Sequence, residues 1–587
     1  MLITKDTTTC KIEYESKEEP IKNKLTTVID DALALDVPNA FLMKKQDKTN
    51  RLKHWDGKKH FFSKSELVFP TGLLNQVLNA ISNYDLGIDY KIKDISKKPF
   101  VNPDDIADDL YLAGKNGLHT LKLRDYQVKA VKNFYKNNTG VINYAVASGK
   151  TAVGAEIIKQ ALPKLKQGQR VAFFTNSSEI FKQSVTNLES FLDTKVGRLG
   201  GGHHTIKQVT VCTIQTVNSY LKINPEKGLN LSTKQSINKK VAKKYLPRFK
   251  SSSSPRKALG SWLILFTPEK KIDQKMQKVF ADIYETHETD AGVINAFQNM
   301  ADEYSKLVKT KHAEDCKKLK FMTDFLDSVV LFVADECHHS KADTWFKVLM
   351  SCHNAVYRAG LSGSIDPKDE ITNQALNAVY GTIVAKATSK QMSDEGYTAH
   401  ATVQMIPIDR PDDIGAISNK KWFDIYRKGI VENKYRNQII VALAEKIAQK
   451  GHTVLIIATQ LDHCDILHDM FSKDKVDSVV IDGQQSNELR TKERDALTQG
   501  KVKIAIVTSI FDEGVDITSI DVLILASGGK AYRQVVQRVG RVLRKDKNGS
   551  DMSYVFDFID KQHRILAKHS NTRVNIYKEQ QFKVKGV

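Results

Sequence analysis

The sequence predicts an α/β protein in which two parallel-sheet domains follow one another and a small α+β domain precedes them. The chain has 587 residues, more than one hydrophobic core can serve, so about three or four domains are expected. From about Tyr111 onward, short β-rich runs alternate with helical stretches. These runs are continuously apolar, which is typical of strands buried in parallel sheets between helices.

The β-rich runs form two sets, which predicts one sheet for each α/β domain. Strands are expected at 140–146, 170–175, 208–214, 328–336 and 358–364, and then at 453–459, 477–482, 503–509, 521–527 and 552–558. The first hundred residues are lysine-rich, mixed in pattern, and close with the proline-punctuated stretch "KKPFVNPDD". The expected parts are an accessory domain over 1–105, α/β domains over 106–400 and 401–565, and a C-terminal tail over 566–587.

An excess of about 110 residues, 218–327, separates the third and fourth strands of the first set. Residues 221–257 hold eleven Lys or Arg against one acid, Glu226, which predicts a mobile basic loop. Residues 269–325 are expected to be helical, because apolar residues such as Ile294 and Phe297 step by three or four. The insertion is either an added DNA-gripping element or a disordered tether.

Composition excludes several classes of protein. No apolar run approaches eighteen residues, so no transmembrane helix is expected. The N-terminus has no apolar segment with a cleavage site, so the sequence predicts a cytoplasmic protein. The six cysteines form no C-x-x-C pair, which argues against a zinc site or a disulfide framework. The net charge of +21 favours a polyanionic partner, most often nucleic acid, over a merely basic surface.

The stretch "YAVASGKT", 144–151, ends like a phosphate-binding loop but has Tyr144 where the first glycine belongs. It follows a predicted strand and opens a predicted helix, so backbone N–H groups and the helix dipole can hold an anion. Lys150 would reach the β- and γ-phosphates of ATP, and Thr151 would bind Mg²⁺. The candidate phosphate cradle consists of Ala147, Ser148, Gly149, Lys150 and Thr151.

The stretch "DECHH", 335–339, directly follows the apolar strand "VVLFVA". Asp335 is placed to hold the Mg²⁺ shell, and Glu336 can orient and deprotonate an attacking water. The alternative interpretation is an ordinary charged strand terminus. That alternative explains one acidic residue better than it explains this adjacent pair.

The stretch "QRVGRVLR", 537–544, opens a helix-like segment. Arg538, Arg541 and Arg544 are spaced by three, so they share one helical face. Arginines aimed at a phosphate raise the rate of NTP hydrolysis by roughly 10³ to 10⁵. A solvated basic face is the alternative, although Gly540 disfavours an ordinary surface helix.

These three elements, in this order, resemble the motifs of superfamily two helicases over residues 120–560. The resemblance implies two RecA-like domains with ATP in the cleft between them, and Mg²⁺ as its partner. It places the adenine-reading motif at "LRDYQ", with Arg124 and Gln127. It places nucleic-acid contacts at "TNSSE", "TIQT" and "TSIFDEGVD". The implied contact residues are Asn176, Ser177, Thr213, Gln215 and Thr508.

The same resemblance implies further roles. The stretch "SGS", 362–364, matches the motif that couples the ATP and nucleic-acid sites. The implied coupling residues are His338, Ser362 and Ser364, and the implied nucleotide contacts from the second domain are Gly514, Asp516, Gln537, Arg541 and Arg544. Among these, Arg541 and Arg544 would be arginine fingers. The sequence departs from the family at Tyr144 and Ala147, where glycines are usual, and in the long insertion.

A narrower resemblance is to the phage UvsW-type DNA helicases. It rests on "HWDGKKHFF" (54–62), "VFPTGLL" (68–74), "GLSGS" (360–364) and "KHSNTRVNIYKE" (568–579). It implies a DNA-binding accessory domain and remodelling of forks, Holliday junctions, D-loops or R-loops in recombination, replication or repair. The implied partners are branched or single-stranded DNA, RNA–DNA hybrids, and recombination or single-strand-binding proteins of a phage, in the host cytoplasm and away from membranes.

Three other functions remain open on the sequence alone. The chain could be an RNA helicase, because such motors grip phosphates and run on either polymer. It could be the motor subunit of a restriction-type complex, which tracks duplex DNA without parting the strands. It could also be a degenerate scaffold that binds ATP without turnover, an interpretation motivated by Tyr144 and Ala147.

Overall fold

The structure, a computed structural model, describes all residues except 15–18, 48, 50–51, 84–88, 115–119, 146–147, 226–230, 410–420, 509–519 and 543–551. The chain divides into two compact units. The first unit comprises Met1–Asn218 with Phe325–Val587, and the second is Ser219–Asp324. None of the helices in the described ranges is both long enough and apolar enough to cross a membrane.

The N-terminal residues form a four-stranded sheet in the order β5-β2-β1-β6, packed against helices α1 and α3. Its core includes Ala375 and Ala378 of helix α14, so this part packs onto the first α/β domain. The rings of Phe61 and Phe346 meet edge to face at 5.6 Å across the same contact. The elements are β1 Leu2–Lys5, β2 Thr9–Glu13, α1 Glu19–Leu33, β3 Leu35–Asp36, α2 Ala40–Gln46, β4 Lys58–Lys59, β5 Val68–Pro70, α3 Leu74–Asn83 and β6 Lys91–Asp94.

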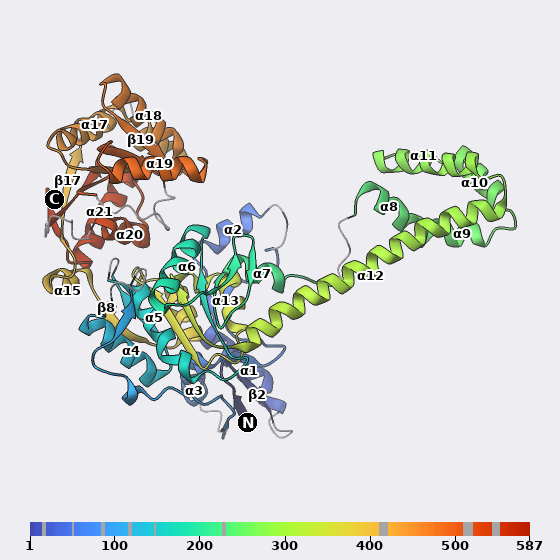
Figure 1. Ribbon diagram of the computed structural model, residues 1–587, viewed down its shortest axis with the longest axis horizontal. Helices are drawn as coiled ribbons and strands as arrows, with labels where there is room; N and C mark the ends of the chain where they lie inside the picture. Colours follow the sequence, from blue (N-terminus) through green and yellow to red (C-terminus); the bar gives the residue numbers. More distant parts are fainter. Residues whose placement is uncertain are drawn as a thin grey trace. The chain divides into compact units, whose positions relative to one another are not determined.

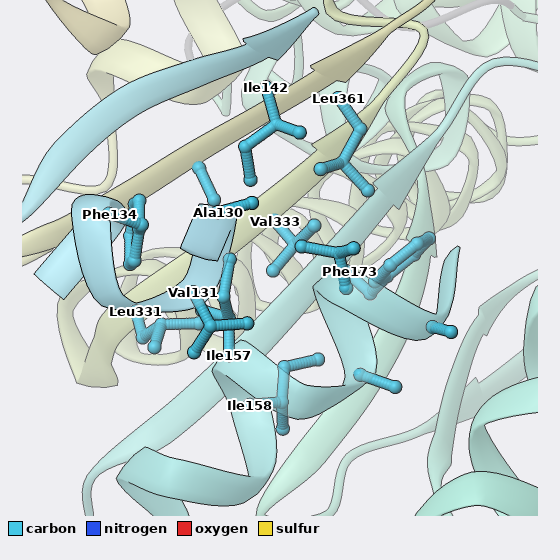
Figure 2. Packing of buried hydrophobic residues seen from close by; sticks show 14 of the residues in the cluster. Ala130, Val131, Phe134, Ile142, Ile157, Ile158, Phe173, Leu331, Val333 and Leu361 are labelled. Carbon is cyan, nitrogen blue, oxygen red and sulfur yellow. The ribbon is translucent and has the colours of Figure 1, made fainter. Parts of the chain in front are cut away.

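The first α/β domain is built on an eight-stranded sheet in the order β12-β11-β13-β10-β14-β15-β9-β16. Every pairing is parallel except that of β12 with β11. Figure 2 shows part of the apolar core between this sheet and helices α4 (Asp125–Asn137) and α5 (Lys150–Ala161), to which Phe134, Ile157, Val333 and Leu361 belong. The strands are β9 Thr139–Tyr144, β10 Arg170–Thr175, β11 Gly197–Gly200, β12 His203–Thr205, β13 Val209–Thr213, β14 Val329–Asp335, β15 Tyr357–Ser362 and β16 Ile383–Ala387.

The helices of this domain connect the parallel strands and are α4 Asp125–Asn137, α5 Lys150–Ala161, α6 Ser178–Leu192, α7 Ile214–Leu221, α13 Asp343–Met350, α14 Glu370–Tyr380 and α15 Ser389–Asp394. A short hairpin, β7 Tyr111–Ala113 with β8 Thr120–Lys122, precedes them. The five strands that the sequence predicts here all form, each within two residues of its expected ends.

The second α/β domain has a seven-stranded, wholly parallel sheet in the order β19-β20-β18-β21-β22-β17-β23. Its strands are β17 His400–Ile408, β18 Val454–Ile457, β19 Ser478–Ile481, β20 Ile504–Val507, β21 Val522–Leu525, β22 Met552–Asp560 and β23 Lys583–Lys585. Its helices are α16 Trp422–Tyr426, α17 Lys434–Gln449, α18 Leu461–Lys473, α19 Asn487–Thr498, α20 Tyr532–Val542 and α21 Arg564–Glu579. The two parallel sheets confirm the predicted fold class.

The expectation of a C-terminal tail over 566–587 is wrong. Helix α21 packs its buried face on the second sheet, and β23 pairs in parallel with β17. Arg573 of α21 is buried and bonds both carboxylate oxygens of Asp557, at 2.8 and 3.0 Å. The hydroxyl of Tyr577 donates to the same carboxylate at 2.7 Å. The segment is therefore an integral part of the second domain.

The expectation of a mobile loop over 221–257 is also wrong for most of that segment. Residues 233–250 are continuously helical, as α8 Thr233–Lys240, a π-helical turn Val241–Tyr245 and α9 Leu246–Lys250. Ile237, Val241 and Phe249 of this segment are buried. Residues 233–250 hold seven Lys or Arg and six apolar residues, and those six suffice to bury one face of a helix.

Three further helices complete the second unit: α10 Pro255–Leu265, α11 Lys271–Thr286 and α12 Asp290–Ser328. Figure 1 shows α8 to α11 gathered around one end of the long helix α12. Their shared core contains Tyr245, Trp262 and Phe280, whose rings lie 4.8 to 5.4 Å apart, and Phe297 of α12. The helical prediction for 269–325 is confirmed.

Candidate nucleotide and nucleic-acid site

The candidate phosphate loop connects β9, which ends at Tyr144, to α5, which begins at Lys150. Gly149 adopts a left-handed conformation with φ 78° immediately before the helix. A Cβ atom at Gly149 would lie 2.5 Å from Nε2 of Gln127, so both the backbone and the available space require glycine here. Ser148 is fully buried, and its Oγ has no hydrogen-bond partner in the described part of the chain. Ala147 lies outside the described residues.

Tyr144 anchors the loop rather than weakening it. Its buried hydroxyl donates to the carbonyl oxygen of Tyr126 at 2.6 Å, and the two rings meet edge to face at 5.3 Å. The hydroxyl of Tyr126 donates in turn to the carbonyl oxygen of Ser148 at 2.7 Å. Strand β9 and the loop are thereby tied to the first turn of α4, which explains how a loop with tyrosine in this position holds its shape.

The two predicted adenine-site residues lie beside this loop. The side-chain amide of Gln127 donates to the carbonyl oxygen of Ser148 at 2.9 Å and accepts from the backbone N–H of Arg124 at 2.9 Å. The Arg124 guanidinium stacks 4.7 Å from the ring centroid of Tyr397. Gln127 therefore touches the phosphate loop directly. Its role as reader of the base stays a prediction.

Lys150 is the first residue of α5, and Thr151 is the second. The Lys150 ammonium donates to the carbonyl oxygens of Tyr144 at 3.2 Å and Ala145 at 3.4 Å. Gly363 closes the other side of this ammonium. A Cβ atom at Gly363 would lie 2.8 Å from Lys150 Nζ and 2.6 Å from the Tyr144 carbonyl oxygen. The middle residue of "SGS" is thus packed against the loop, a role that the sequence did not reveal.

Asp335 is the last residue of β14, and Glu336 follows it in a left-handed conformation with φ 52°. Burial and the neighbouring Glu336 carboxylate raise the pKa of Asp335 to about 7, and Lys150 opposes this shift. Burial also acts to raise the pKa of Glu336, but His338 and Lys150 outweigh it and lower that pKa to about 2. Two adjacent, half-buried carboxyl groups therefore interact with one lysine, and Glu336 ionises more readily than Asp335.

The three predicted coupling residues lie together. Nδ1 of the buried His338 is hydrogen-bonded to Ser362 Oγ at 2.9 Å and lies 3.2 Å from Glu336 Oε2. The backbone N–H of Ser364 donates to the same Ser362 hydroxyl at 3.4 Å. The side-chain amide of Gln537, on α20, donates to Ser364 Oγ at 3.3 Å. A continuous polar chain thus runs from Glu336 through "SGS" to the second α/β domain.

Asn176 and Gln215, two predicted nucleic-acid contacts, are brought together after strands β10 and β13. The Gln215 amide donates to the Asn176 carbonyl oxygen at 2.6 Å. His339 of "DECHH" lies 3.4 Å from the Asn176 side-chain nitrogen, and the Trp345 indole N–H donates to Asn176 Oδ1 at 3.4 Å. Sequence reasoning missed His339 and Trp345. The second histidine of "DECHH" was the available signal for the former.

The other predicted nucleic-acid contacts have local structural duties. Ser177 caps helix α6 by accepting the backbone N–H of Ile180 at 3.3 Å. Thr213 is buried, and its hydroxyl donates to Thr216 Oγ1 at 2.8 Å. Thr508 follows strand β20 and is likewise buried. A direct contact from Thr213 or Thr508 to nucleic acid stays a prediction.

The arginine motif is only partly described. Gln537 and Arg538 lie on α20, whereas Arg544, Gly514 and Asp516 fall outside the described residues, as does the side chain of Arg541. Arg538 is buried, and its guanidinium donates to Ser527 Oγ at 2.6 Å. Arg538 thus fixes α20 to the segment after β21, and the helical face that it was expected to share with Arg541 and Arg544 stays a prediction.

The residues around the loop fit ATP with Mg²⁺. The left-handed Gly149, the Ser148 hydroxyl, which has no partner among the described residues, and the half-buried acid pair near Lys150 suit phosphate and a hard cation. Within the described residues, no group of three or more His, Cys, Asp or Glu side chains could hold a metal ion.

Replacing Gly363 with Ala is expected to weaken ATP binding about 5- to 100-fold. The added methyl group must displace the Tyr144 carbonyl or the Lys150 ammonium, and overpacking of this kind costs about 1–3 kcal/mol. Titration with a fluorescent ATP analogue measures the effect. Gly529→Ala is the matched control, since its nearest atom, Gln534 Oε1, is 4.0 Å away. Equal affinities in the two variants would contradict the assigned contact.

Two family models match parts of the chain. The model described as helicase conserved C-terminal domain matches residues 436–546. The model described as type III restriction enzyme, res subunit, matches residues 120–245. The first of these segments contains the arginine motif, and the second contains the phosphate loop.

The similar proteins include a DNA helicase and an RNA helicase. The chain is 25% identical over 245 residues to ATP-dependent DNA helicase uvsW of Enterobacteria phage T4, a match covering 41% of this chain and 48% of that protein. It is 25% identical over 150 residues to pre-mRNA-splicing ATP-dependent RNA helicase PRP28 of Debaryomyces hansenii, covering 23% and 26%. The chain thus spans about half the length of the T4 relative. The crystal structure of T4 UvsW aligns over 100% of this chain and 99% of that chain, with 16% identity and a TM-score of 0.39.

Proposed function

We propose, from the premise that this chain carries the paired motor domains of a superfamily two helicase and resembles phage UvsW, that it is an ATP-dependent DNA helicase or translocase. Its proposed substrates are branched DNA structures such as forks, Holliday junctions, D-loops or R-loops. The observation that carries the proposal is the half-buried Asp335–Glu336 pair, which interacts with Lys150 and is connected through His338 to Ser362.

Each residue of the site has a chemical duty in this proposal. Lys150, released from the carbonyls of its own loop, pairs with the β- and γ-phosphates. Thr151 and Asp335 would hold Mg²⁺, which when bound neutralises charge on the β- and γ-phosphates. Glu336, held as a carboxylate, orients water and accepts its proton. Arg541 and Arg544 would supply positive charge from the second domain.

Coupling to nucleic acid follows two polar connections from "DECHH". His338 connects Glu336 to the serines of "SGS" and onward to Gln537. His339 contacts Asn176, which Gln215 also bonds. A change in the phosphate site is thereby able to shift both the partner domain and the proposed nucleic-acid contacts.

DNA is favoured over RNA by the resemblance to UvsW, and the T4 relative is described as a DNA helicase. The RNA helicase remains the second candidate, because PRP28 matches part of the same motor. A restriction-type translocase is the third, because one matched family model describes a restriction enzyme subunit.

ATP hydrolysis by the full chain is expected to be stimulated by DNA, most strongly by forked or four-way junctions, and lost in Lys150→Ala. The rates are measured without nucleic acid and with single-stranded, duplex, forked and four-way DNA or structured RNA. Lys159→Ala is the matched control, because Lys159 lies exposed on the same helix, away from the loop. Displacement of a labelled strand is recorded in parallel.

The outcomes separate the candidate functions. Stronger stimulation by structured RNA would make the protein an RNA helicase. Stimulation by duplex DNA without strand displacement would make it a translocase. Binding of ATP without any turnover would overturn the proposal and identify a scaffold.

A further inference from the structure

The second unit, Ser219–Asp324, is a folded module with its own core. Side chains from α8 to α11 and from the first turns of α12 pack together in one core, so the segment is a folded module and not a disordered tether. The buried core residues are Ile237, Val241, Tyr245, Leu246, Phe249, Leu259, Trp262, Met276, Phe280, Ile283, Val293, Phe297 and Ala301. Charges carried by such a module have defined positions.

The module carries a concentrated positive charge. Residues 227–268 contain ten Lys or Arg and no Asp or Glu. Three of the ten pair with a carboxylate or stack on a ring of another helix: Lys240 bonds Asp273 at 2.7 Å, Lys234 lies 3.3 Å from Glu303, and Arg256 stacks on Tyr284 at 4.3 Å. These three stabilise the module itself.

Five of the other seven lie on the continuous helix 233–250 and make up what we call the basic face: Lys239, Lys243, Lys244, Arg248 and Lys250. Four of them are exposed, and Lys239 is half-buried. None of the five forms an ion pair with a carboxylate of the described residues. The contact of Lys250 is with the neutral Gln298, at 2.7 Å.

The basic face differs from an ordinary solvated helix. The stretch 302–318 of α12 is also rich in exposed lysine, at 306, 309, 317 and 318, but acidic residues at 302, 303, 314 and 315 are interleaved with them. That mixture is typical of a helix surface in water. The helix 233–250 contains no acid, and the two carboxylates that contact it, Asp273 and Glu303, pair with Lys240 and Lys234 rather than with the basic face. The charges of the basic face therefore repel one another, and an anion would relieve that repulsion.

We propose that the basic face binds the phosphate backbone of DNA as a site separate from the motor's own nucleic-acid contacts. From Lys239 to Lys250 the helix rises by about 16 Å. One DNA strand carries a phosphate about every 3.4 Å of helix axis, so the face can span about five phosphates. Lysine and arginine side chains on one helix face supply this contact without reading sequence.

The position of the module in the sequence connects the proposed DNA contact to the motor. The module follows α7, which carries Gln215, and it returns through α12 directly into β14, which ends at Asp335. The proposed contact is therefore joined covalently to a predicted nucleic-acid residue at one end and to the proposed ATPase acids at the other. It would lengthen the DNA footprint of the motor.

Charge removal tests this proposal more sharply than deletion, because deleting 221–257 would also remove core residues such as Val241 and Phe249. The test variant is Lys243→Gln, Lys244→Gln, Arg248→Gln and Lys250→Gln in the full chain. The matched control removes the same charge from α12, by Lys306→Gln, Lys309→Gln, Lys317→Gln and Lys318→Gln. All eight positions are exposed.

Affinity for a fluorescent forked DNA is measured by anisotropy at several salt concentrations. Each lost phosphate contact lowers the slope of log K against log salt by about 0.9. The test variant is expected to lose about two to four units of slope and to bind at least about tenfold more weakly, while the control stays close to the unsubstituted chain. Circular dichroism and ATP hydrolysis without DNA verify that both variants are folded.

A footprint provides a direct second measurement. Amine acylation of Lys243, Lys244 and Lys250 is expected to fall when DNA is added, and acylation of Lys306, Lys317 and Lys318 is not. DNA binding by the unsubstituted chain with no difference between the two variants, or with no protection of these amines, would overturn this inference alone. If the unsubstituted chain binds no nucleic acid, the proposed function fails together with it.

Discussion

Replacing Glu336 with Gln is expected to slow ATP hydrolysis about 10²- to 10⁴-fold while ATP still binds. A positioned general base contributes an acceleration of this size. Glutamine keeps the length of the side chain and its place beside His338, but it cannot accept a proton from water. The loss is therefore expected in kcat, measured in a steady-state phosphate-release assay with saturating DNA. The affinity for a fluorescent ATP analogue should change little.

Glu156→Gln is the control for this experiment. Glu156 is fully buried on α5, close to the phosphate loop in sequence, and burial raises its pKa. One of its oxygens accepts from Gln160, and no residue of the proposed site contacts it. Its amide variant is expected to retain hydrolysis within a few-fold. A Glu336→Gln chain with the same kcat as this control would contradict the assignment of Glu336 as the base.

Replacing Asp557 with Ala is expected to destabilise the second α/β domain by about 3–5 kcal/mol. The substitution leaves the Arg573 guanidinium buried without its bidentate carboxylate and removes the acceptor of the Tyr577 hydroxyl. An uncompensated buried charge carries a penalty of this size. Asp560, 3.9 Å from Arg573, is too distant to replace both hydrogen bonds.

The measurement should report on this domain alone, because a chain of several domains has no single free energy of unfolding. Native-state hydrogen exchange of the amides in β17 and β22 gives the local value. Asp409→Ala is the control, since Asp409 forms an exposed ion pair with Lys561 at 3.2 Å, and such pairs contribute about 0–1 kcal/mol. Equal exchange in the two variants would refute the role given to α21.

The strands and the order of motifs could be predicted because their signals are local. A run such as "VVLFVADE" shows both a buried strand and the acids at its end within eight residues. The two failures over 221–257 and 566–587 have a common cause. In both segments polar and charged residues together outnumber the apolar ones, yet a few apolar residues, such as Phe249 and Val574, are enough to bury a helix face.

Arg538 shows a further limit of a spacing argument. Its distance of three residues from Arg541 indicates a shared helical face. The spacing does not tell which face of helix α20 packs against the sheet. The structure buries Arg538 against Ser527. Helical periodicity relates residues to one another and does not say which side faces the core.

The sequence by itself determined the order of strand, loop and helix around Gly149 and Lys150, and the acid pair that ends a buried strand. Only the tertiary structure decided why Tyr144 can stand in for a glycine, that Gly363 closes on Lys150, and that His339 contacts Asn176. These partners lie 18, 213 and 163 residues apart in the chain. Contacts over such separations depend on how helices and strands pack, and no local period in a sequence records that packing.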